Sequence, residues 1–102
     1  MAKTTMINVT ATDNELYLVV STPAGSAEIG HIVSGYNNPV SYKVVPQSVL
    51  PPGNYSLTIV GINWGGPAAF DVVLTPAQAG TSYSSASAPV GVVWSKTVPM
   101  TV

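Results

Sequence analysis

Charged residues are scarce in this chain of 102 residues, and cysteine and arginine are absent. Seven residues carry a formal charge, three lysines and four carboxylates, and the one histidine is His31. In an ordinary domain about a quarter of the residues are charged. The usual side chains for acid–base catalysis, metal ligation and phosphate binding are therefore nearly missing. Without cysteine there is neither a disulfide framework nor thiolate chemistry. We expect no metal and no cofactor.

The charge balance and the lengths of the apolar runs exclude two further classes of protein. The net charge is −1 and the pI is near 5.5, so the chain lacks the basic patch that nucleic-acid binding requires. The longest apolar runs, such as residues 16–20, are far shorter than the roughly 20 residues that span a bilayer, so no transmembrane segment is expected. The first residues alternate in polarity and do not form the apolar core of a secretory signal, which predicts a cytoplasmic chain.

The chain is rich in short alternating runs of apolar and polar residues, bounded by glycine, proline, asparagine and serine. Such alternation is typical of β-strands with one buried face, and no long stretch has helical periodicity. The predicted strands are residues 4–12, 15–21, 27–33, 40–45, 55–62, 68–75 and 90–102. A chain of this length forms one domain, residues 1–102. The pattern predicts an all-β fold, a two-sheet antiparallel β-sandwich of about seven strands.

Two connecting segments add to this expectation. Residues 50–57, Leu-Pro-Pro-Gly-Asn-Tyr-Ser-Leu, resemble the turn that leads into a strand in many immunoglobulin-like and transthyretin-like sandwiches. There Pro and Gly set the turn and the tyrosine packs just inside the strand. The resemblance covers this turn alone, and it implies an immunoglobulin-like fold without implying a function. Residues 76–89, rich in Ala, Ser, Gly and Thr, are expected to be a mobile connection.

Two predicted strands break the alternation. Residues 16–20 are apolar on both faces, which predicts that a partner chain covers the outer face. The positive mean hydropathy of +0.35 also favours a homo-oligomer. In the last strand Lys96 shares the parity of the apolar residues, so either a bulge near Ser95 resets the register or the lysine snorkels. Pro99 places this part of the strand at a sheet edge.

Few residues are suited to catalysis. His31 shares strand parity with Ile29 and Val33, so we expect it to be buried and to do no catalytic work. There is no Gly-x-Ser-x-Gly motif, and the carboxylates are scattered over three segments without metal-site spacing. Residues 13–15, Asp-Asn-Glu, could bind calcium weakly, but an Asx turn between the first two strands explains them better. A Ser-His-Asp set using His31 and Asp71 has nothing to support it. We therefore expect no enzymatic activity.

The loops are more informative than the strands. If consecutive strands are antiparallel, residues 12–14, 34–39 and 63–67 lie together at one end. That end would carry amides, a carboxylate and two aromatic rings, a composition suited to neutral sugars, which stack on aromatic rings while amides and carboxylates bind their hydroxyls. The predicted ligand-binding residues are Asp13, Asn14, Tyr36, Asn37, Asn38, Asn63 and Trp64. The same glycines and asparagines are also what tight turns require, and Trp64 would serve equally as a lid on the core.

The sequence thus favours a non-enzymatic, self-associating recognition module that binds neutral carbohydrate, in the manner of a lectin, through loops at one end. The alternative is a structural or self-assembling protein, such as a virion component or an inclusion-forming protein, whose function is its oligomer interface. Low charge and positive hydropathy favour assembly, whereas the polar and aromatic loop residues favour sugar binding. A small hydrolase ranks third.

Overall fold

The computed structural model describes residues 2–102 and contains seven antiparallel strands and one short helix in that range. The strands form one curled sheet in the order β6-β5-β1-β4-β7, with β2 and β3 also paired to β1. The elements are β1 (Met6–Thr22), β2 (Gly25–Ser34), β3 (Tyr42–Val44), α1 (Pro46–Val49), β4 (Asn54–Asn63), β5 (Ala68–Thr75), β6 (Ser82–Ser85) and β7 (Gly91–Thr101). Within residues 2–102, no helix has the length and apolar character needed to cross a membrane.

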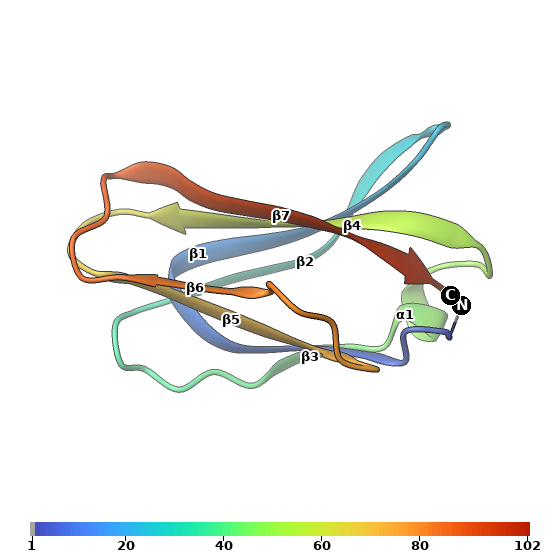
Figure 1. Cartoon of the computed structure of the whole chain (residues 1–102), viewed down its shortest axis with the longest axis horizontal. Coiled ribbons are helices and arrows are strands. Elements are labelled where there is room, and N and C mark those ends of the chain that lie inside the picture. The colour runs from blue at the N-terminus through green and yellow to red at the C-terminus, as the bar shows by residue number, and fades with distance from the viewer. Residues whose placement is uncertain (1) are drawn as a thin grey trace.

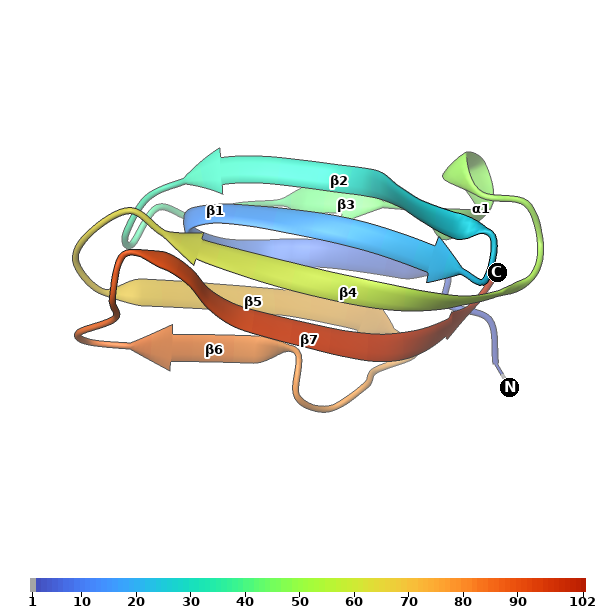
Figure 2. The ribbon, with the colours of Figure 1, turned by 90° about the horizontal axis from the view of Figure 1, so that it is seen from above.

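Strand β1 takes part in both halves of the curled sheet. Residues 6–13 pair with β3 and β5, whereas residues 14–22 pair with β2 and β4. We call β6, β5, β3 and the first part of β1 the β5 half, and β7, β4, β2 and the second part of β1 the β4 half. The two halves face each other (Figures 1 and 2).

The predicted turn at Asp13 and Asn14 is wrong, because the two predicted strands are one bent strand. Asp13 remains paired with Ala69, and Asn14 is already paired with Ser34. The chain therefore changes direction without leaving the ladder of backbone hydrogen bonds, so no loop is needed there.

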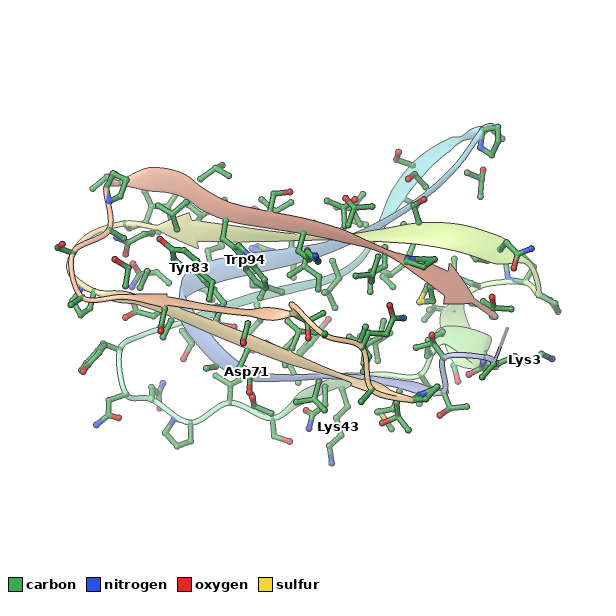
Figure 3. The ribbon with its side chains drawn as sticks, viewed as in Figure 1. Lys3, Lys43, Asp71, Tyr83 and Trp94 are labelled. Atoms are coloured by element: carbon green, nitrogen blue, oxygen red, sulfur yellow. The ribbon has the colours of Figure 1, made fainter. Side chains whose placement is uncertain are left out.

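The core lies between the two halves. Apolar side chains of β1, β4, β5 and β7 form one buried cluster, which includes Leu57, Ile59, Phe70, Val72 and Leu74. The cluster is close-packed at Gly61, where an added Cβ would lie 2.8 Å from the Phe70 ring. Tyr83 and Trp94 extend the core between the edge strands β6 and β7, and Figure 3 shows both side chains pointing between the halves. Their ring centroids are 6.2 Å apart.

Two β-bulges change which face the side chains point to along part of each edge strand. On β2, Ile29 is an extra residue between the pairs Leu18–Gly30 and Val19–Glu28. The prediction that His31 is buried is therefore wrong: beyond the bulge, His31 and Val33 point outward, and Val33 is 64% exposed. A bulge displaces parity by one residue, so alternation read across it assigns the wrong face.

The second bulge lies on β7 at Val93, between the pairs Gly61–Trp94 and Ile62–Val92. A bulge near Ser95 was one of the two alternatives for this strand, and the observed bulge lies two residues before Ser95. Lys96 stays on the inward parity, and its Nζ would lie 3.1 Å from a Cβ at Gly80, so the ammonium reaches the 76–81 connection. The predicted edge position of Pro99 is confirmed, since within residues 2–102 β7 pairs with β4 alone.

The connection 76–89 contains a strand that the sequence analysis missed. Strand β6 pairs with β5 through residues 82–85, and Thr81 is buried just before it. The Thr81 hydroxyl donates to the Val72 carbonyl at 2.6 Å, and the Val72 N–H donates to the Thr81 carbonyl at 3.0 Å. These bonds attach the segment to the edge of the β5 half.

The turn over residues 50–57 packs as predicted, with Tyr55 half-buried at the start of β4. Its hydroxyl donates to the Pro51 carbonyl at 2.7 Å. Gly53 and Val102 exchange both backbone hydrogen bonds, at 2.8 and 2.9 Å. The turn therefore ties the C-terminal strand to the start of β4.

Candidate functional site

One end of the molecule gathers the bend of β1 and the connections 35–41, 64–67 and 86–90, at the left of Figure 1. The N- and C-termini lie at the opposite end (Figure 1). The seven predicted ligand-binding residues belong to this loop end, but they fall into three different settings. Four line a hollow over the β5 half, two lie beside Glu15 on the β4 half, and one is buried between loops.

The hollow over the β5 half has a volume of about 510 Å³. It lies between the bend of β1 and the loop that follows β2. Its lining residues are Thr10, Ala11, Thr12, Asp13, Gly35, Tyr36, Asn37, Asn38, Pro39 and Ala69. Asp13, Tyr36, Asn37 and Asn38 were predicted from the sequence as ligand-binding residues, and the structure brings these four together.

Asp13 is the one carboxyl group that lines the hollow. The residue is 3% exposed, and within residues 2–102 its Oδ2 has no hydrogen-bond partner. Burial raises the pKa of Asp13 above its ordinary value, because a low-dielectric surrounding disfavours the charged form. A buried acceptor without a donor is costly, so the protein retains a polar group here that its own side chains do not satisfy.

The loop that borders the hollow combines turn chemistry with exposed polar groups. Asn37 has a φ of 58°, a left-handed conformation that asparagine tolerates better than most residues. The Asn38 side-chain amide donates to the Ser34 hydroxyl at 3.1 Å, and its backbone N–H donates to the Gly35 carbonyl at 3.2 Å. Tyr36 is 66% exposed. The left-handed backbone thus explains why an asparagine stands at position 37, whereas the geometry of the turn does not require the exposed ring of Tyr36.

Trp64 and Asn14 lie away from the hollow lining, on the side of the β4 half. The Trp64 backbone N–H donates to Asn14 Oδ1 at 2.7 Å, and its indole N–H donates to Glu15 Oε1 at 2.9 Å. Trp64 is 59% exposed, so it is not a lid on the core. Asn14 positions the β4–β5 loop, and Glu15 holds the indole ring over the outer face of β1.

Glu15 is the centre of a hydrogen-bonded cluster that sequence analysis did not find. Its Oε2 accepts the Tyr17 hydroxyl at 2.9 Å and lies 2.6 Å from His31 Nε2. The Tyr17 and His31 rings stack with centroids 4.1 Å apart and planes 7° from parallel. Hydrogen bonds from Trp64, His31 and Tyr17 hold the pKa of Glu15 below its ordinary value. The hydrogen bond from the Tyr17 hydroxyl to Glu15 raises the pKa of Tyr17.

Asn63 is fully buried and connects two loops. Its side-chain amide lies within hydrogen-bond distance of the carbonyls of Gly66, Pro89 and Ala88, at 3.0, 3.1 and 3.3 Å. Its Oδ1 accepts the Gly65 N–H at 3.4 Å. These contacts make Asn63 a residue that fixes the shape of the loop end and leave it no free face toward the hollow.

Among residues 2–102 no group of three or more His, Asp or Glu side chains lies close enough to hold a metal ion. Comparison of the chain with protein-family models, with curated proteins and with solved structures finds no match. The hollow and the two outer faces of the sheet are therefore the features that bear on function.

Proposed function

We propose that this protein is a non-enzymatic recognition module that binds a neutral carbohydrate in the hollow over the β5 half. The observation that carries the proposal is the buried carboxyl oxygen of Asp13, which lacks a donor from the described chain. This oxygen is closed to solvent in the structure, so a sugar hydroxyl supplies the donor by displacing the lining that covers it. A hydrogen bond to an ionised acceptor is among the stronger ones.

The other lining groups suit the same ligand. The exposed ring of Tyr36 offers a surface on which the apolar face of a sugar stacks. Asn37 and Asn38 are exposed and add amide donors and acceptors. No lysine lines the hollow, so an anionic ligand would meet a carboxylate with nothing to offset the repulsion. A neutral polyol fits this set of groups better than an acid or a phosphate.

The arrangement of the titratable groups supports a binding role rather than catalysis. Asp13 has no second carboxyl group and no histidine beside it in the hollow lining. His31 is bonded to Glu15, on the outer face of the other half of the sheet. A general acid and a general base flanking one cleft, as hydrolysis of a glycoside requires, would need groups that the hollow lining does not contain.

We also propose that the curled sheet belongs to the β-sandwich class, with an immunoglobulin-like arrangement. Two features support this assignment. The core lies between two facing halves, each with one face toward the core. In addition, the Tyr55 hydroxyl bonds back to Pro51 at the turn that resembles immunoglobulin-like sandwiches.

An array of neutral glycans, followed by calorimetric titration of the best binder, tests the proposed function. Asp13→Asn keeps the shape of the side chain and removes one acceptor, and Tyr36→Ala removes the stacking surface. Each is expected to weaken binding about tenfold or more. Trp64→Ala is the matched control, because this exposed aromatic ring does not line the hollow. Equal losses in all three variants, or no glycan binding by the unaltered protein, would overturn the proposal.

A second candidate function is a structural, self-assembling protein. Val33 and Val92 on the outer face of the β4 half are 64% and 66% exposed, which favours this candidate. Light scattering recorded beside the glycan array separates the two, because large assemblies without glycan binding would favour a structural role. A defined small oligomer that binds a glycan would favour the recognition module.

A further inference from the structure

Exposed valines make the outer face of the β4 half apolar at the loop end. One row of cross-strand partners runs across four strands, from Val33 on β2 through Glu15 and Ile62 to Val92 on β7. Because paired residues point to the same side of a sheet, these four side chains share the outer face. Trp64 and Val90, which are 59% and 66% exposed, belong to the adjoining loops.

The face becomes more polar away from the loop end. The next outward row contains His31, Tyr17, Val60 and Ser95, and the row after it contains Glu28, Val19, Thr58 and Thr97. The Thr58 and Thr97 hydroxyls bond each other at 2.9 Å. An apolar area bordered by hydroxyl groups has the composition of a protein interface, with an apolar centre and a polar rim.

The carboxylate on the apolar area is already hydrogen-bonded within the chain. This carboxylate, Glu15, receives hydrogen bonds from Trp64, Tyr17 and His31. Withdrawing Glu15 from water therefore costs less than withdrawing an unpaired carboxylate. The second carboxylate of this face, Glu28, lies two rows away and is exposed. Two copies of this area would therefore face each other with both Glu15 carboxylates hydrogen-bonded within their own chains.

We propose that this face binds the same face of a second copy of the chain in a two-fold symmetric dimer. This inference rests on the proposed self-association and assigns the surface that carries it. A symmetric contact pairs like with like, so an apolar area whose one carboxylate is hydrogen-bonded within its own chain is complementary to itself. The net charge of −1 adds almost no repulsion between copies.

The area of the face agrees with a dimer rather than a larger contact. Four strands about 4.8 Å apart, rising about 3.3 Å per residue over roughly ten residues, present a face of roughly 600 Å². Two such faces bury roughly 1,200 Å², the lower end of the range for specific interfaces. The dimer therefore needs most of this face, and a single charge in the valine row is expected to dissociate it.

Sedimentation velocity over a concentration series tests the proposal with two matched variants. Val92→Asp places a charge in the valine row, whereas Val73→Asp places the same charge at a 44% exposed valine on β5, outside this face. The unaltered chain and Val73→Asp are expected to be dimers at micromolar concentration, and Val92→Asp is expected to be a monomer. Thermal unfolding checks that each variant is folded.

The outcomes separate the surface from self-association itself. A monomeric unaltered chain would overturn both. A dimer that persists in Val92→Asp would overturn the surface and leave self-association standing. If Val92→Asp does not fold, Val92→Thr keeps the branched shape. It is expected to raise the dimer dissociation constant roughly tenfold, because the symmetric contact loses two buried methyl groups. An unchanged dissociation constant in Val92→Thr would overturn the surface.

Discussion

Asp13 and Glu15 lie two residues apart on β1, yet they have opposite surroundings. Asp13 belongs to the β5 half, is almost completely buried and has an oxygen without a partner in the described chain. Glu15 belongs to the β4 half, and its carboxylate receives three hydrogen bonds. Burial raises the pKa of Asp13, and the hydrogen bonds lower the pKa of Glu15. The bend of β1 between them sends each side chain to a different outer face.

The two carboxylates, a side-chain type that is scarce in this chain, therefore have different roles. The hydrogen bonds of Glu15 are satisfied within the chain, so its role is to position Trp64, Tyr17 and His31. Asp13 has an oxygen without a hydrogen-bond donor in the described chain, and this is the group that the proposed ligand would bind. The outer faces follow the same division. Asp71 and Lys43 point outward from the β5 half, whereas valines dominate the outer face of the β4 half at the loop end (Figure 3).

The largest expected effect comes from removing each of two carboxylates on the β5 half in turn. Asp13→Ala removes a buried group without a donor, so the free energy of unfolding at neutral pH is expected to rise by about 1 to 3 kcal/mol. Asp71→Ala is the control, because Asp71 accepts the Thr10 hydroxyl at 2.7 Å; it is expected to be destabilising. Chemical denaturation measures both. A destabilised Asp13→Ala would show that the carboxyl group has a partner after all.

A smaller effect is expected in how the free energy of unfolding falls at low pH. The pKa of Glu15 is lowered in the folded chain, so its contribution is present above the unfolded pKa of about 4.3 and is lost as pH falls through the folded pKa. The pKa of Asp13 is raised, so its contribution is full below the unfolded pKa and falls as pH rises through the folded pKa. Thermal unfolding between pH 2 and 6 is expected to show a weaker acid loss in Glu15→Gln. An identical slope in the variant would contradict the three-donor cluster.

The smallest expected effect is that of Trp64→Ala on stability. The ring is 59% exposed and is held by an exposed hydrogen bond, so the free energy of unfolding is expected to change by about 1 kcal/mol or less. A buried tryptophan would instead cost about 3 to 5 kcal/mol. Denaturation curves of this variant distinguish the two, and a loss in the higher range would place the ring in the core.

The sequence predicted the strands whose alternation is undisturbed. The inward residues of β4 and β5 follow from simple parity, because neither strand carries an extra residue. His31 was assigned to the wrong face, because the bulge at Ile29, like the one at Val93, arises from pairing with a neighbouring strand rather than from local composition. Strand β6 was missed because three of its four residues are serines, which give it no apolar pattern, and it forms by pairing with the edge of β5.

The sequence predicted that the loops gather at one end, but it did not predict that the seven candidate residues fall into three different settings there. Antiparallel strands bring alternate connections to one end, so the gathering of the loops follows from strand order. The separation of Asp13 from Trp64 depends on the bend of β1, which resembles a turn in the sequence. Glu15 was not found because its donors come from β1, β2 and the β4–β5 loop, and no sequence spacing links these three segments.

The most direct test of the contrast between the two carboxylates is a titration of the side-chain carboxyl carbons by nuclear magnetic resonance. The chain has only four side-chain carboxylates, so one sample follows Asp13 and Glu15 together. Asp13 is expected to titrate above the ordinary aspartate pKa of about 3.9, and Glu15 below the ordinary glutamate pKa of about 4.3. Ordinary values for both groups, or the reverse order of shifts, would show that their surroundings do not differ as described.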